Sequence, residues 1–83
     1  MDIMGMNIAI IGTGNLGRAI SRGLLDTGFP AGQLNLTRRN VEALADFKEK
    51  GCVVSSDNLK AVRQADLIIL GVKPYNVHAI LEE

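Results

Sequence analysis

The stretch IGTGNLGRA, residues 11–19, is the feature that most constrains the fold of this chain. Its glycines, Gly12, Gly14 and Gly17, have the spacing G-x-G-x-x-G and lie between a short apolar run, NIAII, and a segment whose apolar residues recur at helical spacing. Glycine weakens a helix, so three glycines at a helix start indicate that the backbone needs space or unusual dihedral angles there. A strand, a glycine-rich turn and a helix in this order begin a βαβ unit.

The rest of the chain repeats this alternation of strand and helix. We predict strands at 7–11, 34–37, 52–54 and 65–72, and helices at 15–27, at 41–50, through Leu59 and Val62, and at 75–81. Suitable helix-end residues are Gly28 and Gly51 after the first two helices, Asn40 before the second, and Ser56 or Asp57 before the third. Alternating strands and helices predict parallel pairing through right-handed crossovers.

The predicted fold class is therefore α/β, a Rossmann-like parallel sheet of order 3-2-1-4 with flanking helices, by analogy with nucleotide-binding folds. Such domains usually have more strands, so residues 1–83 are expected to be a partial dinucleotide-binding domain, truncated relative to a complete one. With 83 residues, of which 47% are hydrophobic, the chain has enough apolar side chains for one small core.

Composition excludes several function classes. Nine basic and nine acidic residues balance, so we expect no general affinity for nucleic acid or anionic membranes. The N-terminus MDIMGM does not have the pattern of a signal peptide, and every apolar run is far below the roughly 20 residues that span a bilayer. The single cysteine, Cys52, is expected to be buried at a strand start, in a reduced, cytoplasmic protein.

Neither metal-ligand spacing nor a Ser-His-Asp set is evident in the sequence. The lone histidine, His78, is interpreted as an exposed helix residue rather than a catalytic base. We therefore assign no catalytic residue and no metal ligand to the chain.

The three glycines have separate tasks if the loop binds a dinucleotide. Gly12 permits the tight turn out of the strand, Gly14 lets the backbone approach a pyrophosphate, and Gly17 lets the helix pack close to the sheet. Free N–H groups and the positive end of the helix then hold the phosphates. The alternative is a glycine turn that only packs well.

The end of the second strand selects between NAD and NADP. An NAD site has an acidic residue there that binds the ribose 2′-hydroxyl, whereas this chain has Thr37, Arg38, Arg39 and Asn40. Guanidinium groups and a hydroxyl suit a 2′-phosphate, so NADP(H) is favoured. Arg38 is expected to contact the phosphate directly, while Arg39 stacks on adenine or faces solvent. The alternative is an exposed basic turn.

The end of the fourth strand should border the same cleft. Ligands of doubly wound sheets bind at the carboxyl ends of strands near the point where the strand order reverses. Gly71, Val72, Lys73 and Pro74 follow the fourth strand and are expected to line this cleft, with Lys73 facing either the cofactor or solvent.

Together these segments resemble a known family. IAIIGTGNLGRAISRGLL, SSDNLKAVRQADLIILGVKP and their spacing are similar to the N-terminal domain of pyrroline-5-carboxylate reductase, over nearly the whole chain. The family reduces the cyclic imine 1-pyrroline-5-carboxylate with NAD(P)H in proline biosynthesis. Its combination of G-x-G-N-[ML]-G, a D-N pair and A-D-x-x-x-L-x-V-K-P is specific, although each motif alone is weak.

The resemblance implies roles for particular residues. It places Ile11, Gly12, Thr13, Gly14, Asn15 and Leu16 in the pyrophosphate loop. Thr37 and Arg38 fall where the family contacts the adenosine ribose or its phosphate, and Asn58 matches an asparagine near that ribose. The segment from Gly71 to Pro74 matches the family's A-V-K-P, with glycine in place of alanine, a departure expected to be tolerated.

The resemblance also implies parts that this sequence lacks. The family's substrate pocket and dimer interface lie in a following helical domain, so the imine substrate and a homo-oligomer are expected partners only of a longer protein. The chain alone is expected to be inactive. An F420-dependent NADP reductase is the nearest alternative, since it shares GTGNLG and a basic RR, and a non-catalytic nucleotide-binding module is a second one.

Overall fold

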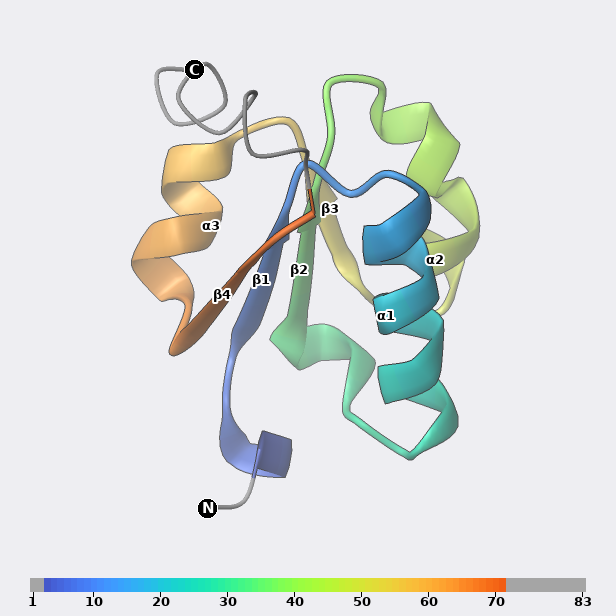
Figure 1. Ribbon diagram of the computed structural model, residues 1–83, viewed down its shortest axis with the longest axis vertical. Helices are drawn as coiled ribbons and strands as arrows, with labels where there is room; N and C mark the ends of the chain where they lie inside the picture. The colour runs from blue at the N-terminus through green and yellow to red at the C-terminus, as the bar shows by residue number, and fades with distance from the viewer. Residues whose placement is uncertain (1–2, 72–83) are drawn as a thin grey trace.

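The computed structural model describes residues 3–71, which form a four-stranded parallel sheet with helices on both faces (Figure 1). In chain order the elements are the 3-10 turn η1 (Ile3–Gly5), β1 (Ile8–Ile11), α1 (Asn15–Asp26), η2 (Ala31–Gln33), β2 (Leu34–Thr37), η3 (Val41–Leu44), α2 (Ala45–Glu49), β3 (Val53–Ser55), α3 (Asn58–Gln64) and β4 (Leu67–Leu70). The strand order β3-β2-β1-β4, with every pair parallel, confirms the predicted fold.

Strand β1 lies at the centre of the sheet because it is apolar on both faces. It pairs with β2 on one side and with β4 on the other. Ile8 and Ile10 contribute to the larger core on the face covered by α1 and α2, which also contains Phe47. Ala9 and Ile11 point to the opposite face, where they pack against α3 (Figure 1). All four β1 side chains are buried, as expected for an inner strand.

Strand β4 is shorter and more exposed than the apolar run at 65–72 predicts. It pairs with β1, but Leu67, Ile68 and Leu70 remain 41%, 42% and 39% exposed among the described residues. The strand begins at Leu67 because the amides of Asp66 and Leu67 both donate to the carbonyl of Asn7 just before β1.

The predicted helix 41–50 was wrong in its first half. Residues 41–44 form the 3-10 turn η3, and only Ala45–Glu49 are α-helical. Asn40 was expected to cap this helix, but its side chain makes no capping hydrogen bond. The first turn instead closes with the tighter bond from the Ala43 amide to the Asn40 carbonyl, 3.1 Å.

The third strand begins one residue later than predicted, at Val53. The amide of Cys52 donates to the carbonyl of Phe47 at the end of α2, so Cys52 belongs to the helix exit. Its side chain is buried, as expected.

Several predicted helix ends are confirmed. Gly28 and Gly51 follow α1 and α2 with φ of +94° and +101°, a conformation that favours glycine. Asp57 caps α3 by accepting a 3.0 Å hydrogen bond from the Lys60 amide. The predicted helix 75–81 and His78 lie outside the described residues. Within residues 3–71, no helix has the length and hydropathy needed to cross a membrane.

Candidate functional site

The glycine loop between β1 and α1 has the backbone shape that its spacing predicts. Gly12 has φ of +70°, which turns the chain sharply out of β1. A Cβ on Gly17 would lie 3.0 Å from Ile10 Cγ2 and 3.2 Å from Thr13 Cγ2, so only glycine lets α1 pack this closely. A Cβ on Gly14 would meet nothing within 4 Å, and the loop is therefore open at this residue.

Within residues 3–71, the amides at the start of α1 lie beside that open position and before the first backbone hydrogen bond of the helix. The first backbone hydrogen bond of the helix runs from the Arg18 amide to the Gly14 carbonyl, 2.9 Å. The amides of Asn15, Leu16 and Gly17 precede it and have no carbonyl acceptor one helical turn earlier. The side chains of Asn15 and Leu16 are exposed. This end of α1 is an N–H-rich surface of the kind that binds phosphate.

The end of β2 holds the glycine loop in place. The Thr13 amide donates to the Thr37 carbonyl at 2.7 Å, and the Gly12 amide donates to Thr37 Oγ1 at 3.1 Å. Thr37 is fully buried, as is Thr13, whose hydroxyl donates to the Ile10 carbonyl. The Thr37 hydroxyl, which the sequence predicts to be a phosphate ligand, faces the loop in this structure and has no exposed surface.

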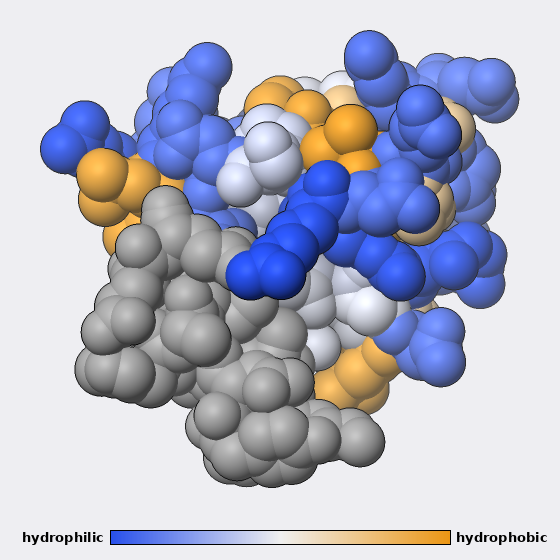
Figure 2. All heavy atoms as spheres, turned by 90° about the horizontal axis from the view of Figure 1, so that it is seen from above, coloured by the Kyte–Doolittle hydropathy of each residue, from blue (hydrophilic) through white to orange (hydrophobic). Residues whose placement is uncertain are grey.

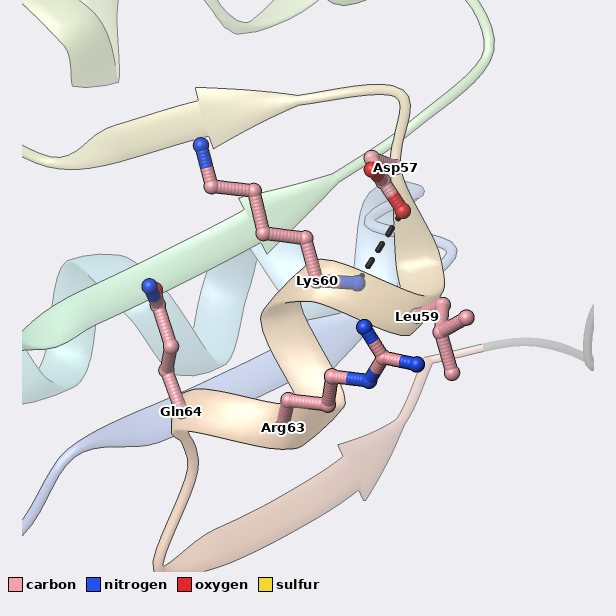
Figure 3. A pocket seen from close by; sticks show the side chains of 5 residues that line it. All are labelled: Asp57, Leu59, Lys60, Arg63 and Gln64. Atoms are coloured by element: carbon pink, nitrogen blue, oxygen red, sulfur yellow. Dashed lines mark hydrogen bonds between the residues drawn. The ribbon is translucent and has the colours of Figure 1, made fainter.

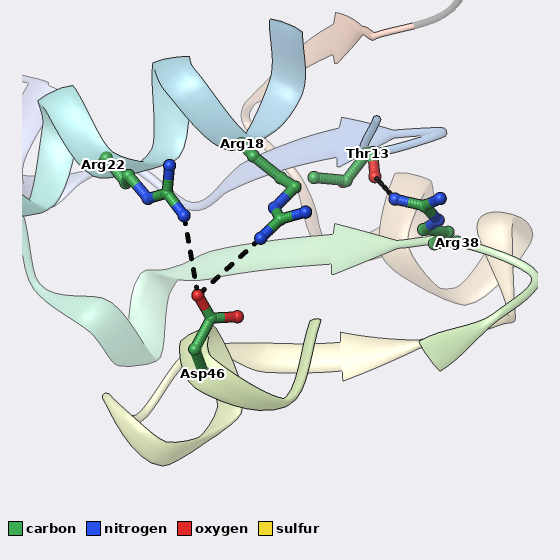
Figure 4. Close-up of polar contacts among 5 residues, drawn as sticks. All are labelled: Thr13, Arg18, Arg22, Arg38 and Asp46. Atoms are coloured by element: carbon green, nitrogen blue, oxygen red, sulfur yellow. Dashed lines mark hydrogen bonds and ion pairs between the residues drawn. The ribbon is translucent and has the colours of Figure 1, made fainter. Parts of the chain in front are cut away.

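Arg38 also reaches the glycine loop. Its Nη1 donates to the Thr13 carbonyl at 3.3 Å, and its backbone amide donates to the Ser55 carbonyl at 3.1 Å (Figure 4). The side chain is half-buried, whereas Arg39 and Asn40 are exposed. The structure thus brings Arg38, which follows β2, next to the loop that follows β1.

These groups lie at the edge of the sheet where the parallel strands end. Figure 2 looks onto this edge, and hydrophilic side chains cover much of its visible surface beside a few apolar ones. The carboxyl end of β4 adjoins the loop, since the Gly71 amide donates to the Ile11 carbonyl at 2.8 Å. A Cβ on Gly71 would lie 3.1 Å from the Gly12 carbonyl oxygen. Val72, Lys73 and Pro74 lie outside the described residues.

Two other predicted site residues are buried. Ile11 supports the loop from below, with its side chain in the small core between β1 and α3. Asn58, the first residue of α3, is 8% exposed. The structure therefore places Asn58 beneath the surface of this edge, where little of its side chain reaches solvent.

A cluster of charges joins α1 to α2 and was not predicted. Arg18 and Arg22 extend from α1 toward Asp46 on α2, with N–O distances of 4.0 Å and 3.7 Å (Figure 4). The Arg22 guanidinium also lies 5.8 Å from the centre of the Phe47 ring. The i, i+4 spacing of the two arginines indicates that they share one face of the helix. It does not indicate their partner, because Asp46 lies on another helix and meets them only through tertiary packing.

A shallow pocket of about 390 Å³ lies on α3, apart from the glycine loop. Its lining side chains come from the helix and its N-cap, as Figure 3 shows: Asp57, Leu59, Lys60, Arg63 and Gln64. The pocket has no residue in common with the predicted site. In residues 3–71 no three His, Cys, Asp or Glu side chains are grouped to hold a metal ion.

Comparison with known proteins identifies the family. The family model described as NADP oxidoreductase, coenzyme F420-dependent, matches residues 7–83. Pyrroline-5-carboxylate reductase 2 of Dictyostelium discoideum is 44% identical over 78 residues, which is 92% of this chain and 26% of that protein. Pyrroline-5-carboxylate reductase of Vibrio alginolyticus is 41% identical over 71 residues, covering 81% of this chain and 25% of that protein.

A solved structure has the same fold. The pyrroline-5-carboxylate reductase of Coxiella burnetii superposes with a TM-score of 0.84 and 36% identity, over 93% of this chain and 29% of that one. The resemblance expected from the sequence is thereby confirmed, although this chain spans only about a quarter of the length of the curated relatives described above. The chain belongs to the family of NADP oxidoreductases that the matching model describes as coenzyme F420-dependent, and most of it is similar to one part of pyrroline-5-carboxylate reductases.

Proposed function

We propose that this chain is the NADP(H)-binding portion of a pyrroline-5-carboxylate reductase, an enzyme that transfers hydride from NADPH to the cyclic imine 1-pyrroline-5-carboxylate to give L-proline. The observation that carries the proposal is the glycine loop, which is open at Gly14 and whose Thr13 carbonyl accepts a 3.3 Å hydrogen bond from Arg38 Nη1. Relatives named for this reaction support the choice of substrate.

The residues present fit a dinucleotide. Open space over Gly14 admits a pyrophosphate, and the amides of the exposed residues Asn15 and Leu16 are placed to donate to it. Gly71 keeps the end of β4 close against the loop. When bound, the reduced nicotinamide would supply the hydride, and the protein orients it.

The preference for NADP(H) over NAD(H) rests on the end of β2. Arg38 and Arg39 follow the strand where an NAD site has a carboxylate, and Arg38 already lies within hydrogen-bonding distance of the loop. A planar guanidinium forms paired, charge-assisted hydrogen bonds with the 2′-phosphate of NADPH. The ribose 2′-hydroxyl of NADH is uncharged and cannot form them. Asn58, Val72, Lys73 and Pro74 complete the proposed cofactor-contacting set.

The substrate is proposed to bind outside this chain's residues, in a helical domain that follows the cofactor-binding part and also joins subunits into a homo-oligomer. This division explains why a chain covering about a quarter of its relatives carries a cofactor loop and no assigned catalytic side chain.

Turnover by the full-length protein tests the reaction. With NADPH present, addition of 1-pyrroline-5-carboxylate is expected to consume NADPH and to produce an equal amount of proline. The second candidate is an F420-dependent NADP reductase, which the description of the family model favours. Hydride exchange between NADPH and coenzyme F420, with no turnover of the imine, would reject the first candidate in favour of the second.

A further inference from the structure

We propose that Thr37 is a positioning residue that shapes the glycine loop for dinucleotide binding and makes no contact with the cofactor itself. The inference rests on the proposed function, because it assigns a task within the same site. It differs from the phosphate-ligand role that the position of Thr37 at the end of β2 suggests.

Two hydrogen bonds and the burial of Thr37 carry the inference. Thr37 Oγ1 accepts from the Gly12 amide at 3.1 Å, and the Thr37 carbonyl accepts from the Thr13 amide at 2.7 Å. Thr37 is also fully buried, with no exposed surface in the described structure. One residue thus pairs two successive amides of a loop that lies 25 positions earlier in the chain.

The pairing sorts the amides of the loop into two groups. Those of Gly12 and Thr13 are used within the protein, whereas, within the described residues, those of the exposed Asn15 and Leu16 precede the first hydrogen bond of α1 and remain for a ligand. Fixing the first group holds the turn at Gly12, whose φ is +70°, and thereby sets the direction in which the second group points. A loop that is already in its binding shape loses less conformational entropy on binding.

The role of Thr37 is separable from that of Arg38, the next residue. The Arg38 guanidinium is a charged group at the site, so its removal should change the ratio of NADPH to NADH affinity. Loop positioning serves the pyrophosphate, which both cofactors share. Loss of the Thr37 hydroxyl should therefore weaken both cofactors by the same factor and leave their ratio unchanged.

Titration of the full-length protein with NADPH and NADH tests this difference. Thr37→Val keeps the side-chain shape but leaves the partly buried Gly12 amide unpaired, so both dissociation constants should rise by about five- to tenfold. Thr37→Ser keeps the acceptor and should bind both cofactors within about twofold of the unmodified protein. Thr27→Val is the matched control, because it removes a hydroxyl at the far end of α1, where Thr27 Oγ1 donates to the Leu24 carbonyl.

Each failure has a distinct result. Unchanged binding by Thr37→Val overturns the inference, and so does a loss confined to NADPH, which would make Thr37 a 2′-phosphate ligand. If the unmodified protein binds neither cofactor, the proposed function itself fails.

Amide hydrogen exchange in the unmodified, cofactor-free protein provides a test that needs no variant to fold. The amides of Gly12 and Thr13 should exchange more slowly than those of Asn15 and Leu16. Equal and fast exchange at all four amides would contradict the positioning role, even if Thr37→Val proves too unstable to titrate.

Discussion

Arg38 Nη1 donates a hydrogen bond of 3.3 Å to the carbonyl oxygen of Thr13, which ties the end of β2 to the loop that leaves β1. The two residues are 25 positions apart in sequence and meet because β1 and β2 are parallel neighbours. A guanidinium, a group that can bind phosphate, is thus placed beside the loop that is proposed to bind the pyrophosphate.

Arg38→Ala is expected to weaken NADPH binding more than NADH binding. A charge-assisted hydrogen bond to phosphate contributes about 1.5–3 kcal/mol, so the NADPH dissociation constant should rise by about tenfold or more. Titration of the full-length protein with each cofactor measures the ratio of the NADPH and NADH dissociation constants. Arg63→Ala, which removes an exposed arginine of α3, is the control and should leave the ratio unchanged. An equal loss for both cofactors in Arg38→Ala would reject the 2′-phosphate role.

Two glycines of α1 should respond to alanine in opposite directions. In Gly17→Ala the new Cβ would lie 3.0 Å from Ile10 Cγ2, so the crowding should lower the free energy of unfolding by about 1–3 kcal/mol. In Gly23→Ala the new Cβ would meet nothing within 4 Å, so the free energy of unfolding should rise by about 0.5–1 kcal/mol, since alanine favours the helix. Denaturant unfolding compares the two, and a stabilised Gly17→Ala would show that α1 does not pack closely on the sheet.

Asp46→Asn should cost little stability, and the cost should depend on salt. The Asp46 side chain is 47% exposed and its contacts with Arg18 and Arg22 are long, at 4.0 Å and 3.7 Å, so the loss should be about 0.5 kcal/mol at low ionic strength. Unfolding measured at low and high salt should show that the difference in unfolding free energy between Asp46→Asn and the unmodified protein shrinks as salt rises. Glu49→Gln, an exposed carboxylate of α2 outside this cluster, is the control. A large loss that salt does not change would contradict an electrostatic origin.

Cys52 should react slowly with thiol reagents and should contribute to alkaline unfolding. Burial raises the pKa of the Cys52 thiol, and the nearby Lys50 ammonium lowers it in part. The folded state favours the neutral thiol. The contribution of Cys52 to the free energy of unfolding is therefore complete below the ordinary thiol pKa and is lost as pH rises through the raised pKa. Stability measured from neutral to alkaline pH should therefore fall more steeply in the unmodified protein than in Cys52→Ala. Parallel curves for the two proteins would show that the thiol is not involved.

The order of elements and the position of the glycine loop follow from local sequence pattern. Apolar runs, helical spacing at 15–27 and the G-x-G-x-x-G motif are properties of neighbouring residues, and they predict the alternation of strands and helices and the turn at Gly12. The strand order 3-2-1-4 was predicted by analogy with nucleotide-binding folds. The boundaries around Asn40 and Cys52 were less predictable. A 3-10 turn begins after Asn40 where a capped α-helix was expected, and Cys52 bonds to the end of α2 where a strand was expected to start. Leu44 and Phe47 are buried in the core, and this tertiary packing competes with local preference.

The sequence by itself determined that the chain builds a dinucleotide-type βαβ unit with arginines after its second strand. Only the tertiary structure decided what each residue there does, because the pairing of β1 with β2 controls which way a side chain points. It turns the Thr37 hydroxyl inward to the Gly12 amide and brings Arg38 to the Thr13 carbonyl. The packing of α1 beside α2 likewise brings Arg18 and Arg22 to Asp46. Such contacts link residues far apart in the chain, and no local pattern of spacing or propensity specifies them.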